Sequence, residues 1–363
     1  MLRKCNIIIA IVFVLSILVV SLPALTEATI TGECSNCHTM HNSQNGSAVN
    51  ASGPNELLLK ADCLGCHAMG TANRIETLGT SSVPQVLHTD PAGDLAGGNF
   101  AYITGTGGYS ADDTHGHNVI DFGVAYKEDV NYNPPGAYHA GQPTADELTC
   151  AGKNGCHGIR EVSSSGVTGI LALKGAHHGN VNGQLSVADT VANSYRFLWG
   201  VKGYEAGNWQ NIDSNNHNEY FGASSPLDYN TTGCGSCHDS SVTYVKPNNQ
   251  TISGFCGGCH GNFHLLDGIG GDTTAPFTRH PTDIIIPSGG EFDAYTTYNI
   301  DAPVARTTVP SAPSSTVSSG TDVVMCLSCH KAHATAYPDM LRWDYTTIVT
   351  GGSGGCLICH TGK

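Results

Sequence analysis

The chain has 363 residues, of which 16 are basic and 30 are acidic, so its formal net charge at pH 7 is −14. This acidity argues against binding to nucleic acid or to anionic lipid surfaces, because both carry negative charge. Glycine supplies 45 residues, only 13% of residues are charged, and no sustained i, i+3, i+4 apolar pattern occurs. The composition therefore predicts mostly coil with few short helices and little regular secondary structure.

The N-terminal segment has the order of a secretory signal peptide. Arg3 and Lys4 precede an apolar run at residues 7–20, and small residues follow at 21–28. Such a run is short for a bilayer span, although a retained membrane anchor is the alternative. We predict that residues 1–28 are a signal peptide whose cleavage removes Cys5 and leaves a mature chain with no membrane span. Losing Arg3, Lys4 and Glu27 changes the net charge from −14 to −15.

The mature sequence opens on a C-x-x-C-H motif, which then recurs. Its two thiols can form thioethers with the vinyl groups of a haem, and its histidine can bind the iron. A zinc ribbon or a set of disulfides would also use paired cysteines, but neither needs a histidine after each pair. The six motifs are Cys34, Cys37 and His38; Cys63, Cys66 and His67; Cys234, Cys237 and His238; Cys256, Cys259 and His260; Cys326, Cys329 and His330; Cys356, Cys359 and His360.

A seventh motif has a wider loop. Five residues separate Cys150 from Cys156, and His157 follows. Glycines in that loop allow both sulfurs to reach one porphyrin edge, although a disulfide between the two cysteines is the alternative. With this motif, fourteen of the fifteen cysteines are used, and we predict seven covalently attached haem c groups.

The spacing of the motifs predicts one domain. They fall into a couple, a lone third, a second couple and a third couple. Residues 54–69, 193–201 and 339–345 are expected to form short helical pieces, and residues 93–113 and 301–320 to form loops, the latter on the surface. The chain has few residues for each predicted haem and cannot build a large core around them. We therefore expect the haem faces to supply the apolar area that side chains normally bury. Residues 29–363 are therefore predicted to be a single, haem-scaffolded heptahaem cytochrome c domain.

Eleven further histidines are candidates for the second axial ligand. Two histidines on one iron leave it low-spin with no open position, which favours electron transfer over catalysis. We predict no catalytic residue, since neither a dinucleotide fingerprint nor a nucleophile motif occurs. His115 and His139 are regarded as spares, and one member of the pair His177 and His178 is expected to ligate. The candidate ligands are His41, His88, His117, His177, His178, His217, His264, His280 and His333.

Several pieces resemble the OmcS-type extracellular multihaem cytochromes, which polymerise into electron-conducting filaments. The matching pieces are residues 34–43, 116–118, 256–264, 279–281, 326–334 and 356–363. The resemblance implies a coil-rich fold and a continuous stack of haems along a polymer. It also implies that His41 ligates a haem of the next subunit, at the motif that contains His330. The motif at Cys234 has no counterpart in the type members, which carry six haems.

The favoured function is an exported multihaem cytochrome that carries electrons through closely packed bis-histidine haems. Its expected location is secreted, either extracellular or on the cell surface. Its expected partners are other copies of itself, redox partner cytochromes and extracellular electron acceptors. A monomeric periplasmic or surface electron shuttle, in which His41 serves its own chain, is the first alternative. A multihaem reductase with one five-coordinate haem is the second.

Overall fold

The computed structural model describes residues 30–123, 133–136, 143–160, 169–173, 190–209, 213–225, 251–264 and 278–363. Regular structure is sparse in these ranges, which confirms the predicted coil-rich fold. The α-helices are one or two turns long: α2 (Cys34–Cys37), α3 (Cys63–His67), α4 (Ala101–Thr104), α6 (Ile252–Gly257) and α7 (Cys326–Cys329). The predicted signal peptide, the motif of Cys234, Cys237 and His238, and the candidates His139, His177 and His178 lie outside the described residues.

One mixed sheet organises the C-terminal half. Its strand order is β7 (Gly203–Tyr204), β8 (Glu219–Phe221), β10 (Ala305–Arg306), β11 (Val323–Val324) and β9 (Ile284–Ile285). The β8 and β10 strands are parallel, with Ala305 opposite Tyr220, and the other pairs are antiparallel. The sheet thus joins three segments that are distant in the sequence.

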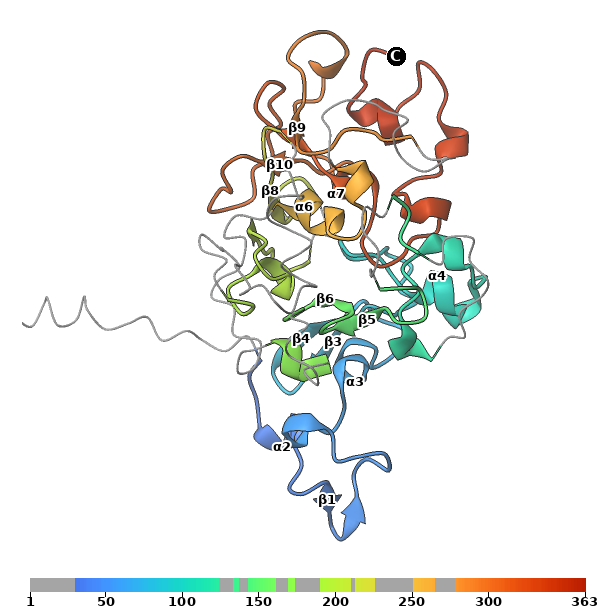
Figure 1. Ribbon diagram of the computed structural model, residues 1–363, viewed down its shortest axis with the longest axis vertical. Coiled ribbons are helices and arrows are strands. Elements are labelled where there is room, and N and C mark those ends of the chain that lie inside the picture. Colours follow the sequence, from blue (N-terminus) through green and yellow to red (C-terminus); the bar gives the residue numbers. More distant parts are fainter. Residues whose placement is uncertain are drawn as a thin grey trace, which may run out of the picture.

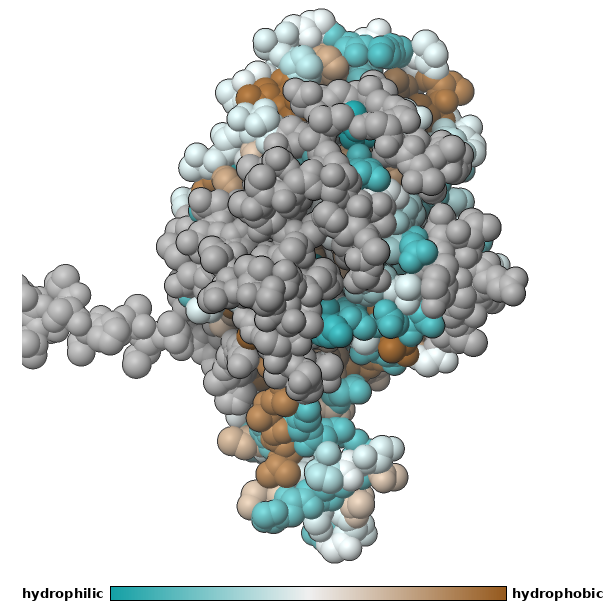
Figure 2. All heavy atoms as spheres, viewed as in Figure 1, coloured by the Kyte–Doolittle hydropathy of each residue, from teal (hydrophilic) through white to brown (hydrophobic). Residues whose placement is uncertain are grey.

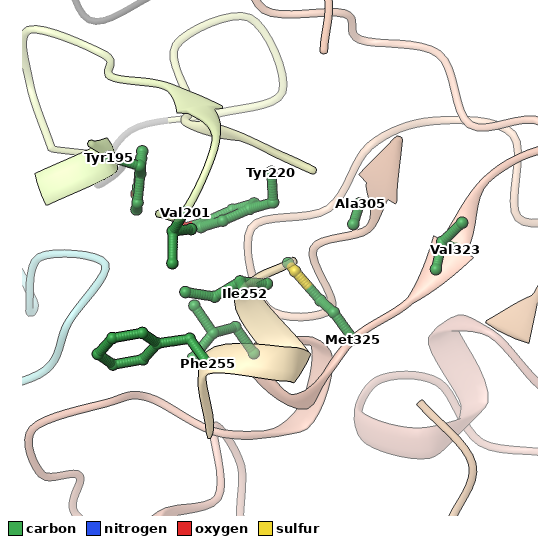
Figure 3. Close-up of a cluster of buried hydrophobic side chains, with 9 residues drawn as sticks. Tyr195, Val201, Tyr220, Ile252, Phe255, Ala305, Val323 and Met325 are labelled. Carbon is green, nitrogen blue, oxygen red and sulfur yellow. The ribbon is translucent and has the colours of Figure 1, made fainter. Parts of the chain in front are cut away.

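The main apolar cluster packs between this sheet and α6. Figure 3 shows Tyr195, Tyr220, Ile252 and Met325 converging on one another, with Val323 on the strand behind. Two smaller clusters lie around Tyr295 and around Phe100. The apolar core is thus divided into small units, which agrees with the expectation that the chain builds no large core.

Residues 301–320 form the expected surface loop only in part: residues 307–316 carry no helix or strand and none of them is buried, whereas residues 302–306 are buried. Ala305 and Val317 are buried, and the Arg306 guanidinium donates to Glu219 Oε2 at 3.2 Å and also pairs with Asp322. A second Arg306 nitrogen donates to the carbonyl of Thr316 at 2.8 Å. The Pro, Ser and Thr content did not indicate this burial. It is possible because the buried Arg306 donates hydrogen bonds to carbonyls of the segment, which would otherwise lack partners.

Residues 93–113 also differ from the expected loop. They contain α4 and a 3-10 turn at Thr106–Gly108. Phe100, Ala101 and Ile103 are buried there and belong to the cluster around Phe100 or lie beside it. Four residues of helix are too few to give a periodic apolar pattern in the sequence.

The haem motifs follow one another along the long axis of the molecule. Figure 1 shows α2, then α3, then the pair β5 (Thr149–Ala151) and β6 (Gly155–His157), then α6 and α7, with the C-terminus at the far end. At the N-terminal end, β1 (Ser43–Gln44) and β2 (Ser47–Ala48) form a projecting hairpin. Asn45 and Gly46 at its turn both have positive φ, as the favoured two-residue hairpin turn requires.

The remaining two-stranded sheet is β3 (Ile75–Leu78) with β4 (Ser81–Pro84), paired antiparallel. In the ranges described, no helix is long and apolar enough to span a membrane.

Candidate haem sites

A single helical turn builds most of the C-x-x-C-H motifs. In α2 and α7 the two cysteines are the first and last residues of the helix. The amide of the following histidine donates to the carbonyl of the first cysteine, at 2.8 Å for His38 and 3.1 Å for His330. Residues three and four apart lie on one helix face, so both thiols and the imidazole are presented to the same side. This is the arrangement that one covalently attached haem needs.

The wider motif uses a different scaffold. Cys150 and Cys156 lie on β5 and β6, which pair in parallel with Ala151 opposite His157. The Cys150 amide donates to Asp121 Oδ2 at 3.1 Å. The strand pairing brings the two cysteines together despite the longer loop. Both are free thiols, as are the other ten cysteines within the described ranges, so the alternative disulfide is absent from this structure.

Each described motif histidine has a hydrogen-bond acceptor for its Nδ1. The acceptor is a main-chain carbonyl in five cases and a carboxylate in one. A proton on Nδ1 leaves the Nε2 lone pair available to a metal, and the acceptor fixes the orientation of the ring. The pairs are His38 with Leu57 O (3.1 Å), His67 with Pro84 O (2.9 Å), His157 with Arg196 O (2.8 Å), His260 with Pro135 O (2.8 Å), His330 with Asp339 O (2.8 Å) and His360 with Glu291 Oε1 (3.0 Å).

Three of these carbonyls belong to residues with a left-handed backbone. The φ angles are 56° at Leu57, 46° at Arg196 and 59° at Asp339, and in each case the next residue is also left-handed. That next residue accepts a backbone hydrogen bond from the residue after the motif histidine. We call each such two-residue turn a clip; the three are Leu57 with Leu58, Arg196 with Phe197, and Asp339 with Met340.

The clips correct the prediction of short helices at residues 193–201 and 339–345 and in the first part of 54–69. Left-handed backbone is unfavourable for residues other than glycine and concentrates at functional sites. Here its effect is to turn one carbonyl toward a motif histidine. In each clip a leucine follows the two left-handed residues: Leu59, Leu198 and Leu341. Within residues 54–69, the helix α3 (Cys63–His67) confirms the predicted helix only in the second part of the range.

Three pairs of imidazole rings face each other at a common separation. The ring centres are 6.2 Å apart for His117 and His260, 6.3 Å for His157 and His333, and 6.4 Å for His280 and His360. A metal–imidazole bond is about 2 Å long and the ring centre lies about 1 Å beyond the nitrogen, so two imidazoles on opposite sides of one iron are about 6 Å apart. The residues present therefore fit a bis-histidine haem at three motifs.

Backbone hydrogen bonds between three segments, here called the backbone clamp, hold the rings of His117 and His333 in position. The segment around His333 and Ala334 lies between residues 97–99 and 115–117. The His333 amide donates to Gly97 O at 2.6 Å, and the His117 amide donates to His333 O at 3.0 Å. A Cβ on Gly98 would lie 2.0 Å from the Ala334 carbonyl oxygen, so this position needs glycine. The clamp holds His117 and His333 near each other, with His117 opposite His260 and His333 opposite His157.

Burial keeps these rings neutral. It lowers the pKa of His260 to about 4 and the pKa of His333 to about 3, and neighbouring histidines add to both effects. Burial also lowers the pKa of His67, His117, His157 and His330. An iron ligand must be the neutral imidazole, so the sites favour the form of histidine that binds metal.

Three other candidates lie in a different environment. His88, His217 and His264 are 0%, 0% and 1% exposed, and the Nε2 of each faces a carboxylate. The distances are 3.8 Å from His88 to Asp94, 3.0 Å from His217 to Glu219 and 3.2 Å from His264 to Asp283.

The rings of these buried histidines have further partners. His217 also stacks on Tyr298, with ring centres 3.5 Å apart. The Nδ1 of His264 lies 3.0 Å from Thr282 Oγ1, and the Nδ1 of His88 accepts the Asp90 amide at 3.3 Å. Their arrangement differs from that of His117, His280 and His333, and their role as ligands stays a prediction.

Two further histidines, His41 and His115, differ in exposure: His41 is exposed and His115 is partly buried. His41 is exposed on the projecting N-terminal region, next to Met40, which is 72% exposed. Figure 2 shows hydrophobic atoms on the surface of this region. His115 lies 3.8 Å from Asp112, and its role as a spare stays a prediction.

Thiols of neighbouring motifs lie close enough to affect one another's pKa. Burial raises the pKa of the thiols of Cys66, Cys150, Cys156 and Cys329, and a thiol from a neighbouring motif raises each further. The pairs are Cys37 with Cys66, Cys63 with Cys150, Cys156 with Cys259, Cys256 with Cys326 and Cys329 with Cys359, of which Cys256 and Cys326 share a hydrogen bond. The described motifs therefore form one row in chain order.

Two features of the sites were missed in the sequence. The clips carry no motif beyond the leucine that follows the two left-handed residues, and the Glu291 carboxylate is distant from His360 in the sequence. Neither signal stands out without the fold. Within the described ranges, no group of three or more His, Cys, Asp or Glu side chains has the arrangement of a metal-ion site.

Comparisons with known proteins agree with this geometry. A family model described as "Doubled CXXCH motif" matches residues 317–363, the third couple. The chain is 26% identical over 381 aligned positions to the C-type cytochrome OmcS of Geobacter sulfurreducens, covering 87% of this chain and 80% of that protein. The chain thus resembles the OmcS-type multihaem cytochromes.

Two solved filament structures were also found, both from Geobacter sulfurreducens. The OmcS nanowire structure has a TM-score of 0.44 and 20% identity, with 93% of this chain and 92% of that chain covered. The outer membrane cytochrome S filament has a TM-score of 0.44 and 19% identity, with 88% and 85% covered.

Proposed function

We propose that this chain is an exported heptahaem c-type cytochrome that conducts electrons along a single row of haems. The observation that carries the proposal is the row itself: six described motifs follow one another in chain order, with three pairs of imidazoles at the separation that suits one iron. Haem, when bound, supplies a one-electron Fe(III)/Fe(II) couple. The cysteines attach it, and the histidines bind and orient it.

The axial pairs follow from the ring geometry. His117 is assigned to the haem of His260, His333 to that of His157, and His280 to that of His360, supported by the separations of 6.2–6.4 Å. The other proposed distal ligands are His41, His88, His264 and one of His177 and His178. His217 is the weakest candidate, because its Nε2 is engaged by Glu219. With both axial positions filled, the iron has no place for a substrate, which favours a conductor over an enzyme.

Assembly into a filament is the finer part of the proposal. The curated relative described above is named a C-type cytochrome, and the two solved structures described above are of nanowires and filaments. His41 projects at one end of the row of motifs, where a second copy could receive it at the haem of His330. A head-to-tail contact of this kind does not close on itself, so it propagates as a filament. We further propose an extracellular or cell-surface location, with redox partner cytochromes and external electron acceptors as partners.

Two measurements test the proposal. Intact mass of the secreted protein is expected to exceed the mass of the mature polypeptide by seven haems. Electron paramagnetic resonance of the oxidised protein is expected to show low-spin signals without a high-spin signal near one haem equivalent. Such a high-spin signal would favour the reductase instead. Negative-stain microscopy separates the filament from the monomeric shuttle.

A further inference from the structure

The hydrogen-bond acceptor of Nδ1 in the last motif histidine, His360, differs in charge from the acceptors of the other five described motif histidines. His38, His67, His157, His260 and His330 place Nδ1 against neutral main-chain carbonyls. His360 places Nδ1 3.0 Å from the carboxylate oxygen Oε1 of Glu291. Among the motif histidines in the described ranges, His360 alone has a side-chain acceptor of this kind.

Glu291 is held firmly in this position. It lies in the 3-10 turn Gly290–Phe292, and its carbonyl accepts the Thr361 amide at 2.7 Å and the Thr361 hydroxyl. Thr361 directly follows His360, so the backbone bond ties the carboxylate to the ring that it contacts. The Lys363 ammonium lies 3.3 Å from the same Oε1, so a cation and the His360 ring contact one carboxylate oxygen.

We propose that Glu291 tunes the haem at Cys356 and Cys359 to a lower reduction potential than a carbonyl acceptor would give, and that Lys363 moderates the effect. A carboxylate acceptor draws the Nδ1 proton and makes the imidazole a stronger electron donor to iron. A stronger donor and a nearby negative charge both stabilise Fe(III) over Fe(II). Glu291 is thus a positioning residue that acts through His360. The inference rests on the proposed function, since it requires a haem at this motif.

Three variants of the full-length, haem-loaded protein test it. Glu291→Gln keeps an oxygen acceptor of the same reach and removes the charge. Lys363→Gln removes the moderating cation. Asp293→Asn is the matched control, because Asp293 lies two residues away in the same turn and accepts the Gly289 amide at 2.8 Å without contacting a ring. A merely structural role for Glu291 would not make the first two variants differ in sign.

The readout is a redox titration followed by absorbance, together with the low-spin resonance signals. In Glu291→Gln, the ratio of oxidised to reduced form of one haem in seven is expected to fall about tenfold at fixed potential, which corresponds to about 59 mV for one electron. Lys363→Gln is expected to shift the same haem in the opposite direction, and Asp293→Asn to leave the curve within about twofold of the parent.

Two results would overturn the inference and can be told apart. If the parent's peptide with Cys356 and Cys359 carries no haem, the proposed function fails at this motif and the inference fails with it. If that peptide carries haem, and Glu291→Gln titrates as the parent does or shifts in the same direction as Lys363→Gln, only the tuning role of Glu291 is wrong.

Discussion

The ring of His117 lies 6.2 Å from the ring of His260, centre to centre, although neither residue is near the other in the sequence. The Nδ1 of His117 is 2.7 Å from Ala332 O, and the Nδ1 of His260 is 2.8 Å from Pro135 O. Both Nε2 atoms are therefore available for the space between the rings. This relationship is the basis for proposing His117 and His260 as the two ligands of one haem iron.

Replacement of His117 by alanine is expected to make one haem in seven high-spin in the oxidised protein, because the haem of His260 loses its sixth ligand. Electron paramagnetic resonance measures this directly. His115→Ala is the control, because His115 lies two residues away and faces Asp112. A high-spin signal of equal size in both variants, or in neither, would contradict the assignment of the pair.

Replacement of His217 by alanine is expected to lower stability and to leave every haem low-spin. The change removes one of the partners of the buried Glu219 carboxylate, which keeps Arg306 and Ser314, and also removes the stacking on Tyr298. A hydrogen bond to a charged group contributes about 1.5–3 kcal/mol to stability. Chemical unfolding of the haem-loaded protein measures the loss. The appearance of a high-spin signal would instead identify His217 as a ligand.

Replacement of Cys150 and Cys156 by serine is expected to reduce the haem content from seven to six. The two strands β5 and β6 present these thiols with His157 much as a helical turn does elsewhere. Intact mass before and after the change gives the count. An unchanged mass surplus would mean that the wider motif attaches no haem, and that the parent carries six.

Replacement of His41 by alanine is expected to give folded monomers that keep all their haems. The exposed position of His41 makes a loss of stability in the subunit small, while one haem in the polymer loses a ligand. Negative-stain microscopy distinguishes monomers from filaments. Ser47→Ala, in the hairpin that follows, is the control and should leave filaments intact. Filaments of normal length from the His41 variant would show that other contacts hold the polymer.

Replacement of Asp339 tests the clip beneath His330. Valine at φ 59° is expected to destabilise the protein by about 1–2 kcal/mol, because a β-branched residue fits the left-handed region poorly. Glycine should be close to neutral, since it adopts this conformation without strain. Chemical unfolding compares the two. Equal loss of stability in both variants would mean that the side chain of Asp339, and not its backbone, matters here.

The sequence alone was sufficient for the coil-rich fold and for the chemistry of the motifs. Both depend on local properties: a glycine-rich chain without apolar periodicity forms few helices, and two cysteines three apart with an adjacent histidine share one face of a turn. The helical turns that carry the cysteine pairs are present in α2, α3 and α7, and their formation depends on no distant residue.

Only the tertiary structure decided which histidines face each other and what lies behind them. His117 and His333 are brought to their partners by a backbone clamp formed from three distant segments, and His217 is turned toward Glu219 by the mixed sheet. The left-handed turns at Leu57, Arg196 and Asp339 carry no local signal that separates them from short helices. The physical reason is that a ring's orientation is set by its hydrogen-bond acceptor, and every acceptor here comes from a part of the chain outside the motif.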